Sequence, residues 1–466
     1  MNPSTFASPP ADACTQDVAG TSGPDRITRT HIGVRGVYMI EKGIGTPLQQ
    51  PYVRYSYTIN GKLGSVTDAN GNAASMSYDG HDRLSRWIFP SKTVAGTIDP
   101  ADYEEYGYDA AGNRTSLRKR DGKMLTYNYD ALNRMISKII PDGGVLTAAQ
   151  TRDVYYDYDN RGLQLNVRFD SLAGQGMKTT FDNAGRTLSS RINLNSVSRP
   201  LAYTWDKNSN RTRVAHPDTA NYFSYAYDLG DRLASVQEFN SATNLLATFA
   251  FDQQGRRANL QKGVASTTGV AITSYGYDAA SRLNSLSDNL ANTVEDTATS
   301  FTYNLVSQIA SRTRSNTAYS YVNEAGGLPS FTRSYAVNGL NQYTSTSSAA
   351  FGYDSNGNVT SSTDSLGTTS YVYDVENRLV SATSPSGSVG LAYDTLGRLW
   401  QMTAGVNVTT FLYDGDELVA EYAGNATTPL SRYVHGAGSD DPIVQYQGQR
   451  SHLPTAAICK ATIWAA

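Results

Sequence analysis

Few side chains in this sequence have the types and spacings that catalysis or metal binding requires. The five histidines are scattered, and no pair has the H-E-x-x-H spacing of a zinc site: His31, His81, His216, His435 and His452. The segments DANGN (68–72) and DSNGN (354–358) faintly resemble calcium loops, but both lack the glutamate that closes such a loop. A G-x-S-x-G elbow and a G-x-x-x-x-G-K-S/T phosphate loop are also missing from the sequence. We therefore expect no catalytic, cofactor-binding or metal-binding residue.

Charge and composition exclude further classes of partner. The chain has 466 residues and a formal net charge of -3, and no run of Lys or Arg offers the basic patch of a nucleic-acid-binding protein. No segment approaches the roughly 18 apolar residues of a membrane-spanning helix, and residues 1–20 lack the pattern of a signal peptide. Cys14 and Cys459 lie near opposite ends, which argues against a disulfide framework. With 32 Tyr and 40 Gly, the sequence favours short strands joined by many turns.

A short phrase repeats along the chain. An aromatic residue followed by Asp recurs in one frame, at Tyr78, Tyr108, Tyr129, Tyr158, Phe181, Trp205, Tyr227, Phe251, Tyr277, Tyr353, Tyr373, Tyr393 and Tyr413. Weaker copies start at Tyr57, Tyr303, Tyr321 and Tyr335. The chain therefore contains about seventeen copies, most of them 20–26 residues apart, and such self-similarity indicates a repeat architecture.

Each copy is typical of a β-hairpin. Residues before the Asp alternate, as in Tyr371-Val372-Tyr373, which places both rings on one face of a strand. The Asp favours the first position of a type I turn. The fourth position after the aromatic holds residues that mostly tolerate a positive φ, namely Gly112, Asn133, Gly162, Gly185, Ser209, Asp231, Gly255, Ser281, Gly357, Asn377 and Gly397. A following Arg, often with Leu, opens the second strand, so we expect very little helix.

The clearest copies define the residues on which the repeat depends. They are Tyr108, Asp109 and Gly112; Tyr129, Asp130, Asn133 and Arg134; Tyr373, Asp374, Asn377 and Arg378; Tyr393, Asp394, Gly397 and Arg398; and Tyr413 with Asp414. Because the Arg lies across the turn from the Asp, we expect a contact between them, worth less than about 1 kcal/mol when exposed. Turn chemistry explains these pairs better than a ligand site, and cross-strand packing explains the Tyr rows better than stacking on sugars.

The Y-D-x-x-G-R-L phrase resembles the YD repeat of Rhs proteins over roughly residues 33–446. YAVNGLNQYTS (335–345), YDGDELVAEY (413–422) and RYVHGAGSDDPIVQY (432–446) look like late repeats and the start of the Rhs-associated core. Related shells occur in Tc toxin complexes and teneurins. The resemblance implies a β-ribbon coiled into a hollow shell around a variable C-terminal toxin, which the core region cleaves free. The tail QRSHLPTAAICKATIWAA departs from that core, so no catalytic aspartate is carried over, and Asp440 and Asp441 are not expected to be nucleophiles or bases.

We expect an all-β fold of tandem antiparallel β-hairpins, the YD repeats, forming a curved ribbon, open spiral or partial shell. At about 4.8 Å per strand, seventeen hairpins make roughly 160 Å of ribbon, about one turn of a spiral. The expected domains are an irregular N-terminal segment (1–32), the YD-repeat ribbon (33–430), and the start of an Rhs-associated core followed by a divergent, truncated tail (431–466).

The function that the resemblance implies is structural. The chain would be a shell segment of a bacterial Rhs-type toxin that encloses or presents a C-terminal effector, without enzymatic activity or cofactor. Its partners would be the remaining shell, the cargo toxin or a delivery apparatus, and its location secreted or at the cell envelope, as in the parent family. One alternative is a surface adhesion module that binds glycans through Tyr-rich faces, and another is an autoproteolytic enzyme. Neither nucleic acid nor a membrane span is expected.

Overall fold

The computed structural model describes residues 27–218, 222–239, 244–263, 270–290, 294–304, 307–316, 318, 334–436, 438, 441–447 and 457–458. The chain divides into two compact units, each made of two separate stretches of sequence. Unit 1 takes in 1–153 and 330–388, and unit 2 takes in 154–329 and 389–466. The weak repeat at Tyr321, the cysteines, His452 and Asp440 lie outside the described residues.

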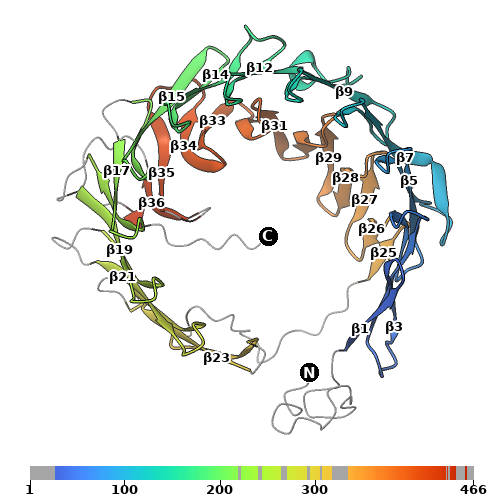
Figure 1. The fold of residues 1–466 in the computed structure, drawn as a ribbon, viewed down its shortest axis with the longest axis horizontal. Helices are drawn as coiled ribbons and strands as arrows, with labels where there is room; N and C mark the ends of the chain where they lie inside the picture. The colour runs from blue at the N-terminus through green and yellow to red at the C-terminus, as the bar shows by residue number, and fades with distance from the viewer. Residues whose placement is uncertain are drawn as a thin grey trace. The chain divides into compact units, whose positions relative to one another are not determined.

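Unit 1 contains two ribbons of antiparallel strands, which Figure 1 draws from blue to teal and in orange. Ribbon 1a comprises β1 (Thr28–Gly33), β2 (Gly36–Lys42), β3 (Gln50–Tyr57), β4 (Leu63–Asp68), β5 (Ala73–Tyr78), β6 (Leu84–Pro90), β7 (Ile98–Tyr108), β8 (Arg114–Arg118), β9 (Met124–Tyr129) and β10 (Met135–Ile139). Ribbon 1b comprises β25 (Tyr335–Val337), β26 (Tyr343–Thr346), β27 (Ala350–Tyr353), β28 (Val359–Asp364), β29 (Gly367–Tyr373) and β30 (Leu379–Ser384). A short 3₁₀ helix, η1 (Ala148–Gln150), follows β10.

Unit 2 has the same construction. Ribbon 2a comprises β11 (Val154–Tyr158), β12 (Gln164–Phe169), β13 (Gly176–Phe181), β14 (Thr187–Leu194), β15 (Val197–Trp205), β16 (Arg211–Ala215), β17 (Tyr222–Tyr227), β18 (Leu233–Glu238), β19 (Leu245–Phe251), β20 (Arg257–Lys262), β21 (Ala271–Tyr277), β22 (Leu283–Leu290), β23 (Thr297–Tyr303) and β24 (Ile309–Arg314). Ribbon 2b comprises β31 (Gly387–Tyr393), β32 (Leu399–Ala404), β33 (Asn407–Asp414), β34 (Glu417–Ala423), β35 (Pro429–His435), β36 (Pro442–Gln447) and β37 (Ala457–Ile458).

Within each ribbon, strands pair with the next strand along the chain in antiparallel fashion, as in β13–β14, β14–β15 and β15–β16. The fold class of tandem antiparallel hairpins with very little helix is therefore confirmed. The first strand starts at Thr28, inside the segment 1–32 that was expected to be irregular. The boundaries at 33–430 and 431–466 stay a prediction.

Each motif hairpin has a β-bulge close to its turn. The second strand carries one extra residue between the partner of the motif aromatic and the partner of the residue before it. In the β31–β32 pair, Tyr393 lies opposite Leu399 while Ala392 lies opposite Gln401, so Trp400 is the extra residue. The side chain of Trp400 is buried, with 3% of its surface exposed. A bulge bends its strand and increases the local twist. The repeat therefore introduces a bend once per hairpin. The extra residue fills the interior at Trp400, whereas the extra residues Ile136 and Leu188 of other hairpins are exposed.

The two units bury different amounts of apolar surface. In unit 2, strands of ribbons 2a and 2b share one large cluster of buried side chains, among them Leu201, Phe223 and Tyr422. In unit 1, the corresponding cluster consists of Leu125, Tyr127, Ile140 and Val375, with partly buried neighbours.

Candidate functional site: the repeat clasp

The motif Asp organises its turn through both carboxylate oxygens. In the β9–β10 hairpin, Oδ1 of Asp130 accepts hydrogen bonds from the backbone N–H groups of Leu132 (2.9 Å) and Arg134 (3.0 Å). Oδ2 accepts a hydrogen bond from Nε of Arg134 at 2.7 Å. The backbone N–H of Asp130 donates to the carbonyl of Arg134, and that of Asn133 donates to the carbonyl of Asp130. The expected contact between Asp and Arg is thus present, together with a full set of backbone bonds.

The fourth position after the aromatic has a positive φ in every strong copy where the sequence predicted one. Asn133 has φ 60°, Ser209 has φ 70° and Gly397 has φ 84°. The same holds for Gly112, Gly162, Gly185, Asp231, Gly255, Ser281, Gly357 and Asn377. A type I turn followed by a left-handed residue closes a hairpin with a bulge, so this position sets where each strand pair begins.

Hydrogen bonds from the turn stabilise the ionised form of the motif Asp. The backbone N–H of Arg83 makes the largest contribution in lowering the pKa of Asp79 from 3.8 to about 2. The pKa of Asp130 is lowered in the same way, first by the backbone N–H of Arg134 and then by its side chain. At neutral pH each such carboxylate is therefore a fixed acceptor for its own turn.

Some repeats replace the Arg and keep its contact. Asn113 and Asn210 stand in the Arg position, and their side-chain amides donate to Oδ2 of Asp109 (2.8 Å) and Asp206 (3.0 Å). In the copy at Tyr158 the Arg position holds Leu163, and Arg161 reaches Oδ2 of Asp159 at 2.8 Å instead. The turn therefore requires a donor to Oδ2, whereas the identity of that donor varies.

The same Arg also binds the next repeat. Nη1 of Arg83 donates to the backbone carbonyl of Asp109 at 2.9 Å, and its guanidinium carbon lies 4.6 Å from the centre of the Tyr108 ring. The hydroxyl of Tyr108 donates back to the carbonyl of Leu84, the residue after Arg83, at 3.0 Å. We call this reciprocal arrangement the repeat clasp. It links consecutive hairpins by a cation–π contact and by hydrogen bonds in both directions.

The complete clasp recurs in unit 2 between Arg282 and the repeat of Tyr303, and other repeats keep some of its contacts. Motif Arg side chains also cover the aromatic ring of the next repeat, with 4.3 to 5.0 Å between the guanidinium carbon and the ring centre. The pairs are Arg232–Phe251, Arg256–Tyr277, Arg282–Tyr303 and Arg398–Tyr413. Motif hydroxyls donate to a carbonyl of the preceding repeat at 2.5 to 3.1 Å from Tyr78, Tyr108, Tyr129, Tyr227, Tyr277, Tyr303, Tyr353 and Tyr413. In these repeats, the polar ends of the tyrosines serve contacts between hairpins.

Among the motif residues named from the sequence, Asp414 differs from the others. It lies at the end of β33 directly opposite Glu417, in a tighter turn with Gly415 at φ 62°. Its carboxylate accepts a hydrogen bond from the hydroxyl of Tyr203 at 2.8 Å and pairs with Arg211 at 2.6 Å. Asp414 therefore joins ribbon 2b to ribbon 2a. The other named aspartates form turns of the Asp130 type, and Asp374 and Asp394 are buried there.

Turns of the same kind also lie at the opposite ends of hairpins, and among these the sequence reading recognised 68–72 as a turn but missed the others. Lys119 donates its backbone N–H to the carbonyl of Lys123, with Gly122 at φ 86°, and Asp68 makes the same turn with Asn72 and Gly71. A Gly three residues after the first turn residue was the signal that would have found them. The two segments once compared with calcium loops, 68–72 and 354–358, are both turns of this type.

The described residues contain no group of three or more His, Cys, Asp or Glu side chains that could hold a metal ion. Helices long and apolar enough to cross a membrane are likewise not found in that part of the chain.

Comparisons with known proteins agree with this geometry. The family model for the RHS Repeat matches residues 108–145 and 353–389. The chain is 24% identical over 213 residues to the tRNA3(Ser)-specific nuclease WapA of Bacillus spizizenii, which covers 45% of this chain but only 8% of that protein.

The likeness to one solved structure extends over nearly the whole chain. The crystal structure of TcdB2-TccC3 covers 95% of this chain at 13% identity and a TM-score of 0.50, and 29% of the solved chain is matched. The structure of TcdB2-TccC3-Cdc42 matches the same share of this chain with a TM-score of 0.45, over 25% of its own chain. At this identity the first match shows the fold alone. The matched repeats show that the chain contains RHS repeats, and its fold is similar to that of the TcdB2-TccC3 structure.

Proposed function

We propose that the chain is a wall segment of an Rhs-type toxin shell that encloses or presents a C-terminal effector, and that it has no catalytic activity of its own. The observation that carries this proposal is the repeat clasp. Motif side chains that look reactive or adhesive in the sequence, namely Asp, Arg and Tyr, are engaged in binding their own turn or the next hairpin. A surface whose polar groups are used to join neighbours is suited to building a wall.

The likeness to known proteins supports the same role. The first solved structure matched is a complex of TcdB2 and TccC3, and WapA is a nuclease much longer than this chain. The present chain spans 29% of the former and 8% of the latter. We therefore propose that it works with the remainder of a shell, a cargo toxin or a delivery apparatus, in a secreted or envelope-associated setting. The proposal includes that the ribbon curves into an open spiral or partial shell.

The alternative of a glycan-binding module that uses the Tyr rows has less support. In the clasp, the hydroxyl of Tyr108 donates to a backbone carbonyl, and one face of its ring is covered by Arg83. A sugar stacking on that face would have to displace an Arg that is also hydrogen-bonded to two neighbouring turns.

Protection of a fused cargo tests the proposed function. A short unstructured peptide with several protease sites is fused after residue 466 and compared with the same peptide fused to an unrelated β-protein. A wall that shelters its cargo should slow cleavage of the peptide about tenfold, because cleavage follows the accessible fraction. Equal cleavage rates in the two fusions would contradict the proposal that this segment itself shelters a cargo. Intact mass after long incubation tests the autoproteolytic alternative, which requires specific cleavage within 431–466.

A further inference from the structure

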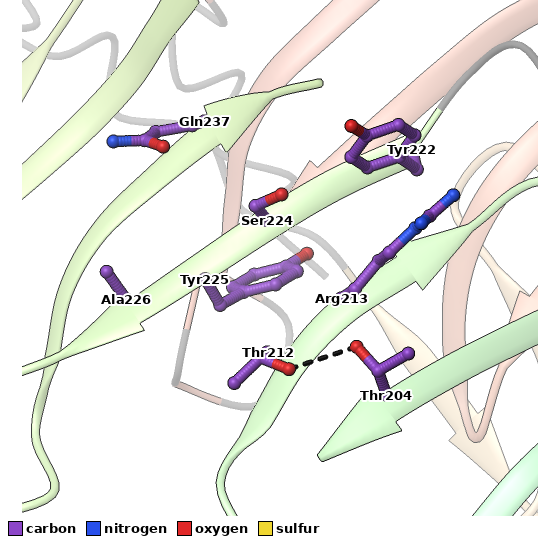
Figure 2. Close-up of a pocket in the computed structure, with 8 residues that line it drawn as sticks. All are labelled: Thr204, Thr212, Arg213, Tyr222, Ser224, Tyr225, Ala226 and Gln237. Carbon is purple, nitrogen blue, oxygen red and sulfur yellow. Dashed lines mark hydrogen bonds between the residues drawn. The ribbon is translucent and has the colours of Figure 1, made fainter. Parts of the chain in front are cut away.

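A polar cavity of about 270 Å³ lies on ribbon 2a, away from the repeat clasps described above. Three cross-strand pairs build it: Thr204 with Arg213, Arg213 with Ser224, and Ser224 with Gln237. Directly paired residues of neighbouring antiparallel strands have side chains on the same face, so these four form one row across β15 to β18. Figure 2 shows the row together with the other residues that line the cavity.

The row lies on the opposite face of the ribbon from the apolar core. The residues next to it along the strands are Tyr203, Val214 and Phe223, which are buried in the core of unit 2. Successive side chains of a strand point to opposite faces. Burial in the core therefore explains the apolar residues on the inward face. It does not explain why the row from Thr204 to Gln237 on the outward face forms a half-buried polar hollow.

Arg213 is the one charged side chain that lines this cavity. Its Nε is buried without a hydrogen-bond partner, and its guanidinium makes no ion pair with any residue in the described part of the chain. The other strand arginines nearby differ, because Arg211 pairs with Asp414 and Arg199 donates to Thr410 and two carbonyls. An arginine has five N–H donors, so Arg213 retains the capacity to bind a planar oxyanion.

The position of Arg213 is fixed by an aromatic pair. Its guanidinium carbon lies 3.7 Å from the centre of the Tyr222 ring. That ring makes a T-shaped contact with Phe239 at 5.6 Å, and its hydroxyl donates to the carbonyl of Phe239 at 3.0 Å. Phe239 itself has φ 56°, a conformation that a bulky residue rarely adopts. The guanidinium is therefore held in place by groups that already have their own partners.

Four other lining residues supply neutral hydrogen-bonding groups. The hydroxyls of Thr204 and Thr212 lie 3.0 Å apart and bond each other, and Ser224 and Gln237 add a hydroxyl and an amide. These groups can both donate and accept, which suits the hydroxyls of a ligand. No Asp or Glu lines the cavity, so nothing there repels a negative charge.

We propose that this cavity binds a small hydroxylated carboxylate, such as a sugar acid, with its carboxylate on Arg213 and its hydroxyls on Thr212, Ser224 and Gln237. The volume is just below the roughly 300 Å³ at which pockets for drug-sized ligands begin, so it accommodates one ring rather than a chain. The site is independent of the shell role and of the motif tyrosines.

Titration calorimetry of the full chain with sodium D-glucuronate tests the proposal. The wild-type chain should bind saturably, and rising salt should weaken binding because the contact is ionic. Arg213→Gln should weaken binding about tenfold or more, and Arg213→Lys should restore only part of it, since an ammonium cannot reproduce the planar fork. Arg191→Gln is the matched control, because it removes the same charge from an exposed position on β14 of the same unit and should bind like wild type.

Three results would overturn the assignment: no saturable binding by the wild-type chain, equal binding by Arg213→Gln, or equal affinity for D-glucose. Acetate binding as tightly as glucuronate would show that the hydroxyl contacts are absent, which also contradicts the proposal. Circular dichroism of each variant checks that it is folded. If Arg213→Gln fails that check, Gln237→Leu removes one hydroxyl partner without touching the charge and should weaken glucuronate binding while leaving acetate binding unchanged.

Discussion

Units 1 and 2 carry the same repeat but hold their two ribbons together with different proportions of polar and apolar contacts. In unit 1, the small apolar cluster around Val375 is accompanied by polar contacts between the ribbons: Asn341 donates to Asp68, the backbone N–H of Asp121 donates to Asn356, and Lys138 pairs with Glu376. In unit 2, the ribbons share an extensive apolar cluster that includes Leu201, Trp400 and Tyr422. The turn motif is thus constant, while the joint between ribbons varies.

A buried arginine reinforces the joint in unit 2. Arg199 of β15 has 3% of its surface exposed, and its guanidinium lies 3.8 Å from the centre of the Tyr422 ring. It donates to the hydroxyl of Thr410 and to the carbonyls of Gly424 and Ala426, all on ribbon 2b. Burial lowers the pKa of Arg199. A charged side chain at this depth stabilises the joint only as long as its acceptors remain in place.

The turn motif therefore determines the local structure of each hairpin, and the contacts between ribbons determine how strongly the two ribbons of one unit are held together. Repeat proteins gain stability from each repeat and from contacts with neighbouring parts of the array. Since the clasp is present in both units, we expect equivalent turn mutations to lower the stability of both units equally. Mutations of residues that join the two ribbons of a unit should instead affect the two units differently. Removing apolar contacts should lower the stability of unit 2 more than that of unit 1.

The largest expected effect comes from the core of unit 2. Phe223 has 1% of its surface exposed and contacts the rings of His216 and Tyr446. Phe223→Ala should cost about 3–5 kcal/mol, because it removes buried area and leaves a cavity. Hydrogen exchange should then accelerate in strands of unit 2 and remain nearly unchanged in β1 to β9. Leu188→Ala, at a position of β14 that is 41% exposed, is the control and should change little. Equal acceleration in both units would refute the proposed difference.

Removing the buried guanidinium should have the next largest effect. Arg199→Ala should destabilise unit 2 by about 2–3 kcal/mol, because hydrogen bonds to a charged group and ring contacts are lost together. Arg199→Met keeps most of the apolar volume and should be less destabilised than Arg199→Ala. The measurement is the denaturant dependence of hydrogen exchange in β33 and β34. Wild-type exchange in both variants would mean that Arg199 does not hold the ribbons together.

Sequence reasoning was most successful where local chemistry decides the structure. The period of the aromatic–Asp pair, the left-handed position at Asn133 and the Asp–Arg contact all depend on residues within one turn, so they were readable from the sequence. The reach of Arg83 to the next repeat was not predicted, because it depends on the spacing of neighbouring hairpins in space.

Long-range partners were the part that sequence could not supply. Asp414 belongs to a motif phrase, yet its carboxylate pairs with Arg211, some 200 residues away in the chain. Arg199 stands in an ordinary strand pattern, and nothing in its neighbourhood indicates that it is buried. The row from Thr204 to Gln237 becomes visible only once the register of β15 to β18 is known. Pairings of this kind arise from tertiary packing.

Acid should weaken unit 2 at a higher pH than unit 1. Burial, with a smaller contribution from Arg432, lowers the pKa of His216 from 6.5 to about 3. The unfolded chain therefore takes up a proton below pH 6.5 that the folded chain does not, so stability is complete above pH 6.5 and falls as the pH decreases. At pH 5 the loss should be about 2 kcal/mol. The turn carboxylates affect stability only at lower pH. The stabilisation by Asp79, for example, is present above pH 3.8 and is lost toward pH 2.

Hydrogen exchange in each unit at pH 7 and pH 5, corrected for intrinsic rates, measures this difference. His216→Leu removes the titrating group and should abolish the extra loss in unit 2 between these values. His81→Leu, at an exposed turn of unit 1, is the matched control. If the two units weaken equally in wild type, the buried histidine is not the cause.

The smallest expected effect, and the one that should be equal in both units, comes from the left-handed turn position. Gly112 in unit 1 has φ 91° and Gly162 in unit 2 has φ 85°, and a Cβ built at either position meets nothing within 4 Å. Replacement by Val therefore introduces conformational strain without a steric clash against neighbours, and each should cost about 1–2 kcal/mol. Replacement by Asn, which tolerates this conformation, should cost less than half as much. Thermal unfolding and local hydrogen exchange measure both pairs. A clearly larger cost of Val in one unit would mean that the turn depends on its unit, and the separation between a constant clasp and a variable joint would fail.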